Sequence, residues 1–226
     1  PAPQEAQALA DLLLAAKRPV LIAGTEAANA QTAAALRELT EWLPLPIFAK
    51  SQAAGVLPAG HPCDGGAAGN LAMLPMIGVE APDLVILLGG KLGLLLGGRS
   101  GAVVPHAAKL AQIHGDATEI GRIRDVDLAI AGDSAETVKA LSAALAGRAP
   151  AGLEDWCAQA LSASGLFASM FPDAEGPGGI HPWHAARAVA EAAGPDALYV
   201  FDGGEAASWG GAASPVNGPA SVLSHG

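Results

Sequence analysis

Aromatic residues, basic residues and cysteines are all scarce in this chain of 226 residues. Aromatic residues make up 4% of the sequence against 51% hydrophobic residues overall, so a core must be built from Ala, Leu, Val and Ile. The net charge of −10 comes from 22 acidic and 12 basic residues, which argues against nucleic-acid binding because that needs a basic patch. The only cysteines, Cys63 and Cys157, are too few for a disulfide framework or a Cys-rich metal site. Their number favours a reducing, cytoplasmic location.

Long hydrophobic runs are also missing. The longest apolar stretch, residues 84–98, is interrupted by glycines and Lys91 and falls short of the roughly 20 apolar residues that span a bilayer. The first predicted helix carries Asp11, Lys17 and Arg18 where a signal peptide would need an apolar segment. We therefore predict a soluble protein with no membrane partner.

The sequence alternates helical patterns with short apolar runs bounded by turn residues. The runs predict five strands, and amphipathic patterns predict helices between them, including residues 29–43 and 134–145. Apolar runs of this kind are typical of parallel strands covered on both faces. The alternation therefore predicts an α/β fold with a doubly wound, Rossmann-like parallel sheet. The predicted strands are residues 20–23, 45–50, 83–90, 108–116 and 127–133.

The pattern changes after Gly147. Residues 148–180 are rich in turn formers, and a second α/β unit then begins with a helix over 182–193, a strand over 197–201 and the turn Asp-Gly-Gly-Glu at 202–205. A strand, a glycine turn and a helix in succession present backbone N–H groups to a phosphate. One such unit cannot bury its own faces. We predict a domain over 1–147, a linker over 148–180 and an incomplete second domain over 181–226.

No complete catalytic or nucleotide motif is present. "GTEAANA" after the first strand and "GGK" at 89–91 lack the spacing of dinucleotide and phosphate-binding loops, and are more typical of strand-end turns. His181 and His184 could place two imidazoles on one helix face for a metal, but no Cys or carboxylate nearby completes the set. The alternative, which we favour, is that His181 caps the helix and Pro182 occupies its first turn. We predict no metal ligand and no catalytic residue in the chain.

Six segments in order nonetheless resemble one known family. They are "AAKRPVLIAG", "PIFAKSQAAGVLPAGHP", "APDLVILLGGKLG", "PHAAKLAQIHGDATEIGR", "DLAIAGDSAETVKAL" and "IHPWHAARAVAEAAGPDALYVFDGG". Their succession resembles thiamine-diphosphate-dependent enzymes of the acetolactate synthase type, over about residues 5–226. Within that group "GGKLGL", "IHPWHAARAV" and "LSHG" are most similar to benzaldehyde lyase and its carboligase relatives.

The resemblance implies an internal piece of a longer polypeptide: a complete central domain, then the first part of a diphosphate-binding domain. It implies thiamine diphosphate and Mg²⁺ as cofactors, a homodimer or homotetramer, and a small-molecule substrate that is a 2-keto acid, an acyloin or an aldehyde. The family's activating glutamate and its Gly-Asp-Gly…Asn magnesium segment have no counterpart here, so the isolated chain is predicted to be inactive. The residues that the resemblance assigns to the cofactor are Gly203, Gly204, Glu205, Ala206, Ala207, His225 and Gly226.

The central domain of some relatives binds a flavin, and those relatives carry an Arg-Phe-Asp-Asp-like sequence after the long strand. This chain has Lys91-Leu92-Gly93-Leu94 at that place, so FAD is not expected. Binding of an adenine nucleotide remains an alternative for the crevice predicted around Gly24, Lys50, Gly89 and Asp116. Arg99, Arg122 or Arg124 would supply positive charge there. The alternative for the whole chain is a non-catalytic nucleotide-binding module.

Overall fold

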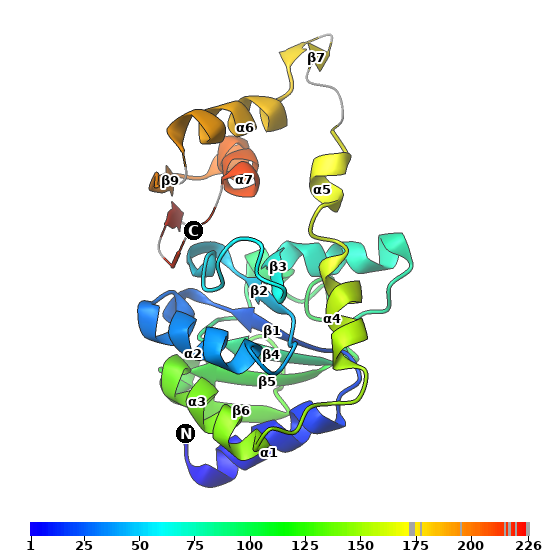
Figure 1. Ribbon diagram of the computed structural model, residues 1–226, viewed down its shortest axis with the longest axis vertical. Coiled ribbons are helices and arrows are strands. Elements are labelled where there is room, and N and C mark those ends of the chain that lie inside the picture. Colours follow the sequence, from blue (N-terminus) through cyan, green and yellow to red (C-terminus); the bar gives the residue numbers. More distant parts are fainter. Residues whose placement is uncertain are drawn as a thin grey trace.

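The computed structural model describes residues 1–171, 175–176, 178–194, 196–214, 216, 218–219 and 221–224. Helices, 3₁₀-helices (η) and strands alternate along most of the chain (Figure 1). In chain order they are α1 (Pro3–Ala15), β1 (Pro19–Ala23), η1 (Thr25–Ala27), α2 (Ala30–Thr40), β2 (Ile47–Ala49), η2 (Ser51–Ala53), β3 (Asp64–Ala67), η3 (Ala68–Ile77), β4 (Leu84–Leu88), η4 (Leu94–Leu96), β5 (Lys109–His114), η5 (Ala117–Glu119), β6 (Leu128–Ala131), α3 (Ser134–Leu145), α4 (Leu153–Leu161), α5 (Leu166–Ser169), β7 (Glu175–Gly176), β8 (Gly179–Ile180), α6 (Pro182–Ala193), β9 (Tyr199–Phe201), α7 (Gly204–Ala213) and β10 (Val222–Ser224).

The first six strands form one parallel sheet in the order β3-β2-β1-β4-β5-β6. This is the strand order of the Rossmann fold, in which the chain starts in the middle and winds outwards in both directions. β1 and β4 pair along their whole length, from Pro19 opposite Leu84 to Ala23 opposite Leu88. Every residue of both strands is buried. The predicted doubly wound parallel sheet is confirmed.

The sheet has one strand more than the sequence predicts. All five predicted strands are present, and β3 is added at the edge beside β2. Its sequence Asp-Gly-Gly-Ala has no apolar run, so the hydrophobic pattern does not predict a strand there. A Cβ on Gly65 would lie 2.4 Å from the ring of Phe48, so the strand fits against β2 because that position has no side chain. The prediction of five strands was wrong for this reason.

Helices cover the sheet and bury one large apolar core. α1, α3 and α2 lie next to one another beside the sheet (Figure 1). The core consists mainly of Leu, Ile, Val and Ala, with Phe48 as one of its largest fully buried side chains. The predicted helices 134–145 and 182–193 coincide with α3 and α6. Among the residues that the structure describes, no helix has the length and apolar character needed to cross a membrane.

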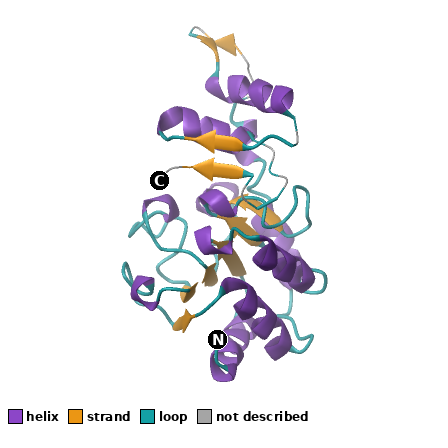
Figure 2. Cartoon of the chain, turned by 90° about the vertical axis from the view of Figure 1, so that its left-hand side faces the viewer, coloured by secondary structure: helices purple, strands orange, loops and turns teal. Residues whose placement is uncertain are grey.

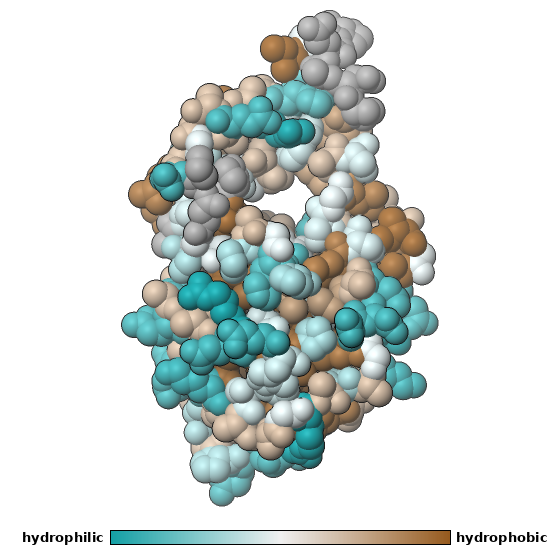
Figure 3. Space-filling model, viewed as in Figure 1, coloured by the Kyte–Doolittle hydropathy of each residue, from teal (hydrophilic) through white to brown (hydrophobic). Residues whose placement is uncertain are grey.

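A second, much smaller cluster lies in the C-terminal part. β9 and β10 pair in parallel (Figure 2). Ala190 of α6, Tyr199 of β9 and Val222 of β10 form the buried centre of this cluster. In the space-filling view an open gap separates the part that carries α6 and α7 from much of the sheet-containing part (Figure 3). The first cluster extends through α4 as far as Ala163. The division into domains at 147 and 181 stays a prediction.

Candidate functional site

The carboxyl ends of the central strands come together around two glycines. A Cβ on Gly24, directly after β1, would lie 2.3 Å from the Cα of Gly90, two residues beyond β4. Gly24 donates its N–H to the carbonyl of Leu88 at 2.7 Å, and Lys50 donates its N–H to the carbonyl of Ala23 at 2.9 Å. Burial lowers the pKa of Lys50, and the charge of Lys91 lowers it further. Gly24, Lys50 and Gly89, three of the residues predicted to surround a crevice, therefore lie together at the ligand-binding edge of a doubly wound sheet.

Glu26 occupies part of this edge. Its backbone N–H donates to the carbonyl of Gly89 at 2.9 Å, and its carboxylate accepts the N–H of Gly115 at 2.9 Å. The other carboxylate oxygen lies 3.5 Å from Nδ1 of His114, a side chain that is almost fully buried. A strand-end N–H that could bind a ligand phosphate is therefore already bound to a carboxylate of the chain itself.

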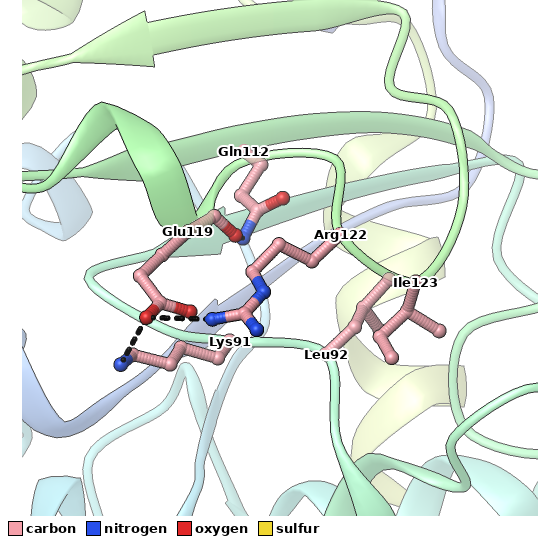
Figure 4. A pocket seen from close by; sticks show the side chains of 6 residues that line it. All are labelled: Lys91, Leu92, Gln112, Glu119, Arg122 and Ile123. Carbon is pink, nitrogen blue, oxygen red and sulfur yellow. Dashed lines mark hydrogen bonds and ion pairs between the residues drawn. The ribbon is translucent and has the colours of Figure 1, made fainter.

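A pocket of about 170 Å³ opens beside these residues at the ends of β4 and β5. It is lined by Lys91, Leu92, Gln112, Glu119, Arg122 and Ile123 (Figure 4).

The polar groups of the pocket bind one another. Lys91 and Arg122 converge on one carboxylate oxygen of Glu119, at 3.1 and 3.0 Å (Figure 4). The hydrogen bond from Lys91, with a further one from Arg122, holds the pKa of Glu119 below its ordinary value. The buried amide of Gln112 donates to the carbonyls of Gly90 and Glu119 and accepts the N–H of Gly121. The charged and amide side chains that line the pocket therefore already have hydrogen-bond partners within the chain.

The other charged residues predicted for the crevice have different roles. Arg124 donates to the carbonyls of Pro105 and Ala108 at 2.9 and 2.8 Å, so it holds the segment before β5 in place. Asp116 caps η5, and its carboxylate accepts both the hydroxyl and the N–H of Thr118. Those bonds lower the pKa of Asp116. Arg99 is exposed on the loop after η4.

The predicted diphosphate turn lies at the carboxyl end of β9, where α7 begins. Gly203 and Gly204 have φ angles of 138° and 72°, which only glycine adopts without strain. Glu205, Ala206 and Ala207 form the first turn of α7, and Gly203 through Ala206 are exposed. The Glu205 carboxylate accepts the indole N–H of Trp209 at 3.2 Å, four residues further along the helix. His225 and Gly226 lie outside the described residues.

The two histidines considered for a metal have structural partners. Nδ1 of His181 accepts the N–H of Trp183 at 3.2 Å, which confirms the predicted helix cap, and Pro182 is the first residue of α6. Nε2 of His184 lies 2.8 Å from the carbonyl oxygen of Phe171. Across the described ranges given above, no group of three or more His, Cys, Asp or Glu side chains is placed to hold a metal ion.

Two features of these sites were missed in the sequence. The carboxylate of Glu26 was not singled out, although an acidic residue two positions after the first strand's glycine was visible. The contact between Cys63 and Cys157 had no signal at all, because the two residues are far apart in the chain and meet only when α4 packs beside β3.

Comparison with known proteins assigns the fold to a family. The family model for "Thiamine pyrophosphate enzyme, central domain" matches residues 6–141. The chain is 31% identical over 211 residues to an acetolactate synthase of Mycobacterium avium, covering 88% of this chain and 32% of that protein. It is 30% identical over 224 residues to the acetolactate synthase isozyme 1 large subunit of Escherichia coli, covering 96% and 37%. It is also 30% identical over 146 residues to an oxalyl-CoA decarboxylase of Escherichia coli, covering 64% and 24%.

The chain spans about a third of the length of these acetolactate synthases. The family match nevertheless covers more than half of the chain and includes all six strands of the Rossmann-ordered sheet. The chain therefore belongs to the thiamine pyrophosphate enzyme family, of the acetolactate synthase type, and residues 6–141 match the central domain of that family.

Proposed function

We propose that the protein containing this chain is a thiamine-diphosphate-dependent enzyme that breaks or forms a carbon–carbon bond next to a carbonyl. The substrates would be 2-keto acids, acyloins or aldehydes. The observation that carries the proposal is the family match over the whole six-stranded sheet. Relatives named acetolactate synthase and oxalyl-CoA decarboxylase support it. When bound, thiamine diphosphate supplies an electron sink for the bond that is broken or formed.

The contribution of this chain to the cofactor site would be the N-terminus of α7. Gly203 and Gly204 form the turn between β9 and α7, with φ angles of 138° and 72°, and the first residues of the helix are exposed. The first N–H groups of the helix have no partner within it, and the helix dipole adds partial positive charge, so a diphosphate is favoured there. The Glu205 carboxylate is bound to Trp209, along the helix.

The remaining assignments are part of the same proposal. His225 and Gly226 would continue the approach to the cofactor. The described residues offer no metal cluster, so we propose that Mg²⁺ ligands and the activating glutamate come from other segments of the protein. A homodimer or homotetramer is proposed on the family resemblance, and a cytoplasmic location on the small number of cysteines.

The central crevice is proposed to hold no flavin. FAD needs donors and acceptors for its phosphate and ribityl oxygens. The N–H of Gly115 is taken by Glu26, and Lys91 and Arg122 are both paired with Glu119. The backbones after β1 and β4 also approach too closely for a ligand to pass between them at Gly24. We expect the purified protein to lack the visible absorbance of oxidised flavin, and a stoichiometric flavin spectrum would contradict this.

The experiment compares this chain with the product of the complete reading frame that encodes it. Each is incubated with thiamine diphosphate, Mg²⁺ and either pyruvate or benzoin, and products are measured by chromatography. The complete product should turn over one of the two, and the isolated chain should not. Turnover by the isolated chain would contradict the assignment of the missing groups to other segments.

Two variants of the complete product test the role of α7. Gly204→Ala places a side chain at a φ of 72° at the start of the helix and should raise the thiamine diphosphate concentration needed for half-maximal activity about tenfold. Gly211→Ala, in the same helix with open space around its Cβ position, is the matched control and should leave it unchanged. Equal behaviour of the two variants would contradict a diphosphate site at Gly204.

The alternative function is a nucleotide-binding module without catalysis, with the pocket at Lys91 as its site. It would be favoured if the reading frame ends where this chain ends and an adenine nucleotide binds while thiamine diphosphate does not. We favour the enzyme because the pocket's cations and amide are already paired within the chain.

A further inference from the structure

The two cysteines of the chain lie in contact inside the protein. Cys63 lies directly before β3, and Cys157 is in the second turn of α4. Both are free thiols, and each is less than 5% exposed. Sγ of Cys157 lies 3.7 Å from the carbonyl oxygen of Pro62, the residue directly before Cys63, and both cysteines belong to the same buried core. Nothing in the proposed chemistry at the sheet edge or at α7 uses this pair.

Packing on both sides of the pair holds the two sulfurs near each other. The indole N–H of Trp156 donates to the carbonyl of the first residue of β1 at 2.8 Å, and this bond is buried. Ser164, just beyond α4, donates its hydroxyl to the carbonyl of Gly65 in β3 at 2.9 Å. α4 is therefore attached to the sheet at points before and after Cys157, which keeps Cys157 close to the segment that carries Cys63.

The two thiols differ in their readiness to ionise. The hydrogen bond from Cys157 lowers the pKa of Cys63. The pKa of Cys157 is raised, first by its bond to Cys63 and then by burial. The thiolate is the form of cysteine that reacts with oxidants. Cys63 therefore ionises more readily than Cys157, which lies beside the segment that carries Cys63.

We propose that Cys63 and Cys157 are a modification site, at which a peroxide converts the two neighbouring thiols into a disulfide that links α4 to the residue directly before β3. The Cys63 thiolate attacks one oxygen of hydrogen peroxide, the O–O bond breaks, and a sulfenic acid and water form. The sulfur of Cys157 then displaces the hydroxyl group as a second water. Two thiols lose two electrons and two protons, and one peroxide is reduced to two water molecules.

The bond would act on the connection between the two parts of the chain. α4 is the last element whose buried residues belong to the large core, and the chain continues from it through α5 to α6. A disulfide at Cys157 therefore fixes the start of that connection to the sheet. Because the loop that it closes is long, it should also stabilise the folded sheet region against unfolding.

The test treats the reduced 226-residue chain with hydrogen peroxide, blocks remaining thiols, and digests it without reducing agent. Mass spectrometry should show an intact mass lower by two hydrogen atoms, and one peptide pair joining Cys63 to Cys157 that dithiothreitol separates. Cys63→Ala and Cys157→Ala should each abolish the linked pair. Two free or separately oxygenated cysteines in the native chain, or links only between chains, would overturn the proposal.

A second readout is thermal stability. The midpoint of thermal unfolding of the wild-type chain should rise by about 5 °C or more after oxidation, and dithiothreitol should reverse the rise. The Cys157→Ala chain given the same treatment should show no such rise. An unchanged or lower midpoint in the oxidised wild type would show that the sulfurs are not positioned for an unstrained bond, and would contradict the proposal.

Discussion

At the scale of single residues, the absence of a side chain decides how the central strands end. At Gly24 a Cβ would meet the Cα of Gly90 at 2.3 Å and the carbonyl oxygen of Gly89 at 2.6 Å. These are backbone atoms of a buried sheet, so they cannot move aside as the end of a flexible side chain can. The φ of Gly24 is −103°, which any residue adopts, so close approach alone requires glycine here.

The substitution Gly24→Ala should therefore destabilise the chain by about 2–3 kcal/mol, because the added methyl group forces the ends of β1 and β4 apart. Chemical denaturation followed by circular dichroism measures this. Gly93→Ala is the matched control, since Gly93 also has an extended backbone and its Cβ position is open. Its effect should stay within about 0.5 kcal/mol. Similar losses for both variants would contradict the steric explanation.

At the scale of an element, local signals at the helix ends fix where helices begin. α3 starts at Ser134 because the carboxylate of Asp133 accepts the N–H of Glu136 at 2.9 Å. α2 starts after Asn29, whose side chain accepts the N–H of Thr32 at 2.8 Å. α6 uses His181 in the same way. Each cap satisfies a helix N–H that has no partner within the helix.

The cap of α3 can be tested alone. Asp133→Ala removes the bond to Glu136 and should lower the free energy of unfolding by about 1 kcal/mol, measured by urea denaturation. Asp133→Asn keeps an oxygen that can accept the same N–H, so it should lower the free energy of unfolding by only about 0.3 kcal/mol. If the asparagine variant is as unstable as the alanine variant, the cap is not the source of the stability.

At the scale of the whole molecule, the two apolar clusters differ greatly in size. The large core joins the six-stranded sheet to α1 through α4, whereas the C-terminal cluster, in the part of the chain that the structure describes, has a buried centre of Ala190, Tyr199 and Val222. Val200, Leu198 and Val189 remain 67–74% exposed around it. The parts meet closely where the loop at Gly55 approaches the carbonyl of Gly218 and the side chain of Val216. A two-stranded sheet with so small a core has little stability of its own.

Limited proteolysis tests this difference. The sequence predicts cleavage between Gly147 and Gly179, and the burial of α4 in the large core narrows the expected site to the residues after Ala163. Cleavage there should leave a resistant N-terminal fragment and rapidly lose residues 181–226. Fragments are identified by mass spectrometry over time. Equal resistance of both parts, or cleavage first within the sheet, would contradict the expectation.

The sequence by itself determined the elements that depend on local patterns. The buried strands β1 and β4 are continuous apolar runs, and the residues directly before α3 and α6 carry the capping signals of these helices. Both kinds of element can therefore be located from the sequence alone. Their location does not depend on the resemblance to a family, because periodicity and capping act over a few residues. The turn at Gly203-Gly204 is likewise predicted from local sequence, since two glycines lie between an apolar strand and a helix.

Only the tertiary structure decided what depends on residues far apart in the chain. β3 forms because Gly65 fits beside Phe48 of the neighbouring strand, not because its own sequence favours a strand. Glu26 binds Gly115, and Lys91 and Arg122 share Glu119, because parallel strands bring their carboxyl ends to one edge. Cys63 meets Cys157 because α4 packs beside the sheet edge. Such contacts are made by packing, and a linear pattern carries no information about which distant side chains will share a neighbourhood.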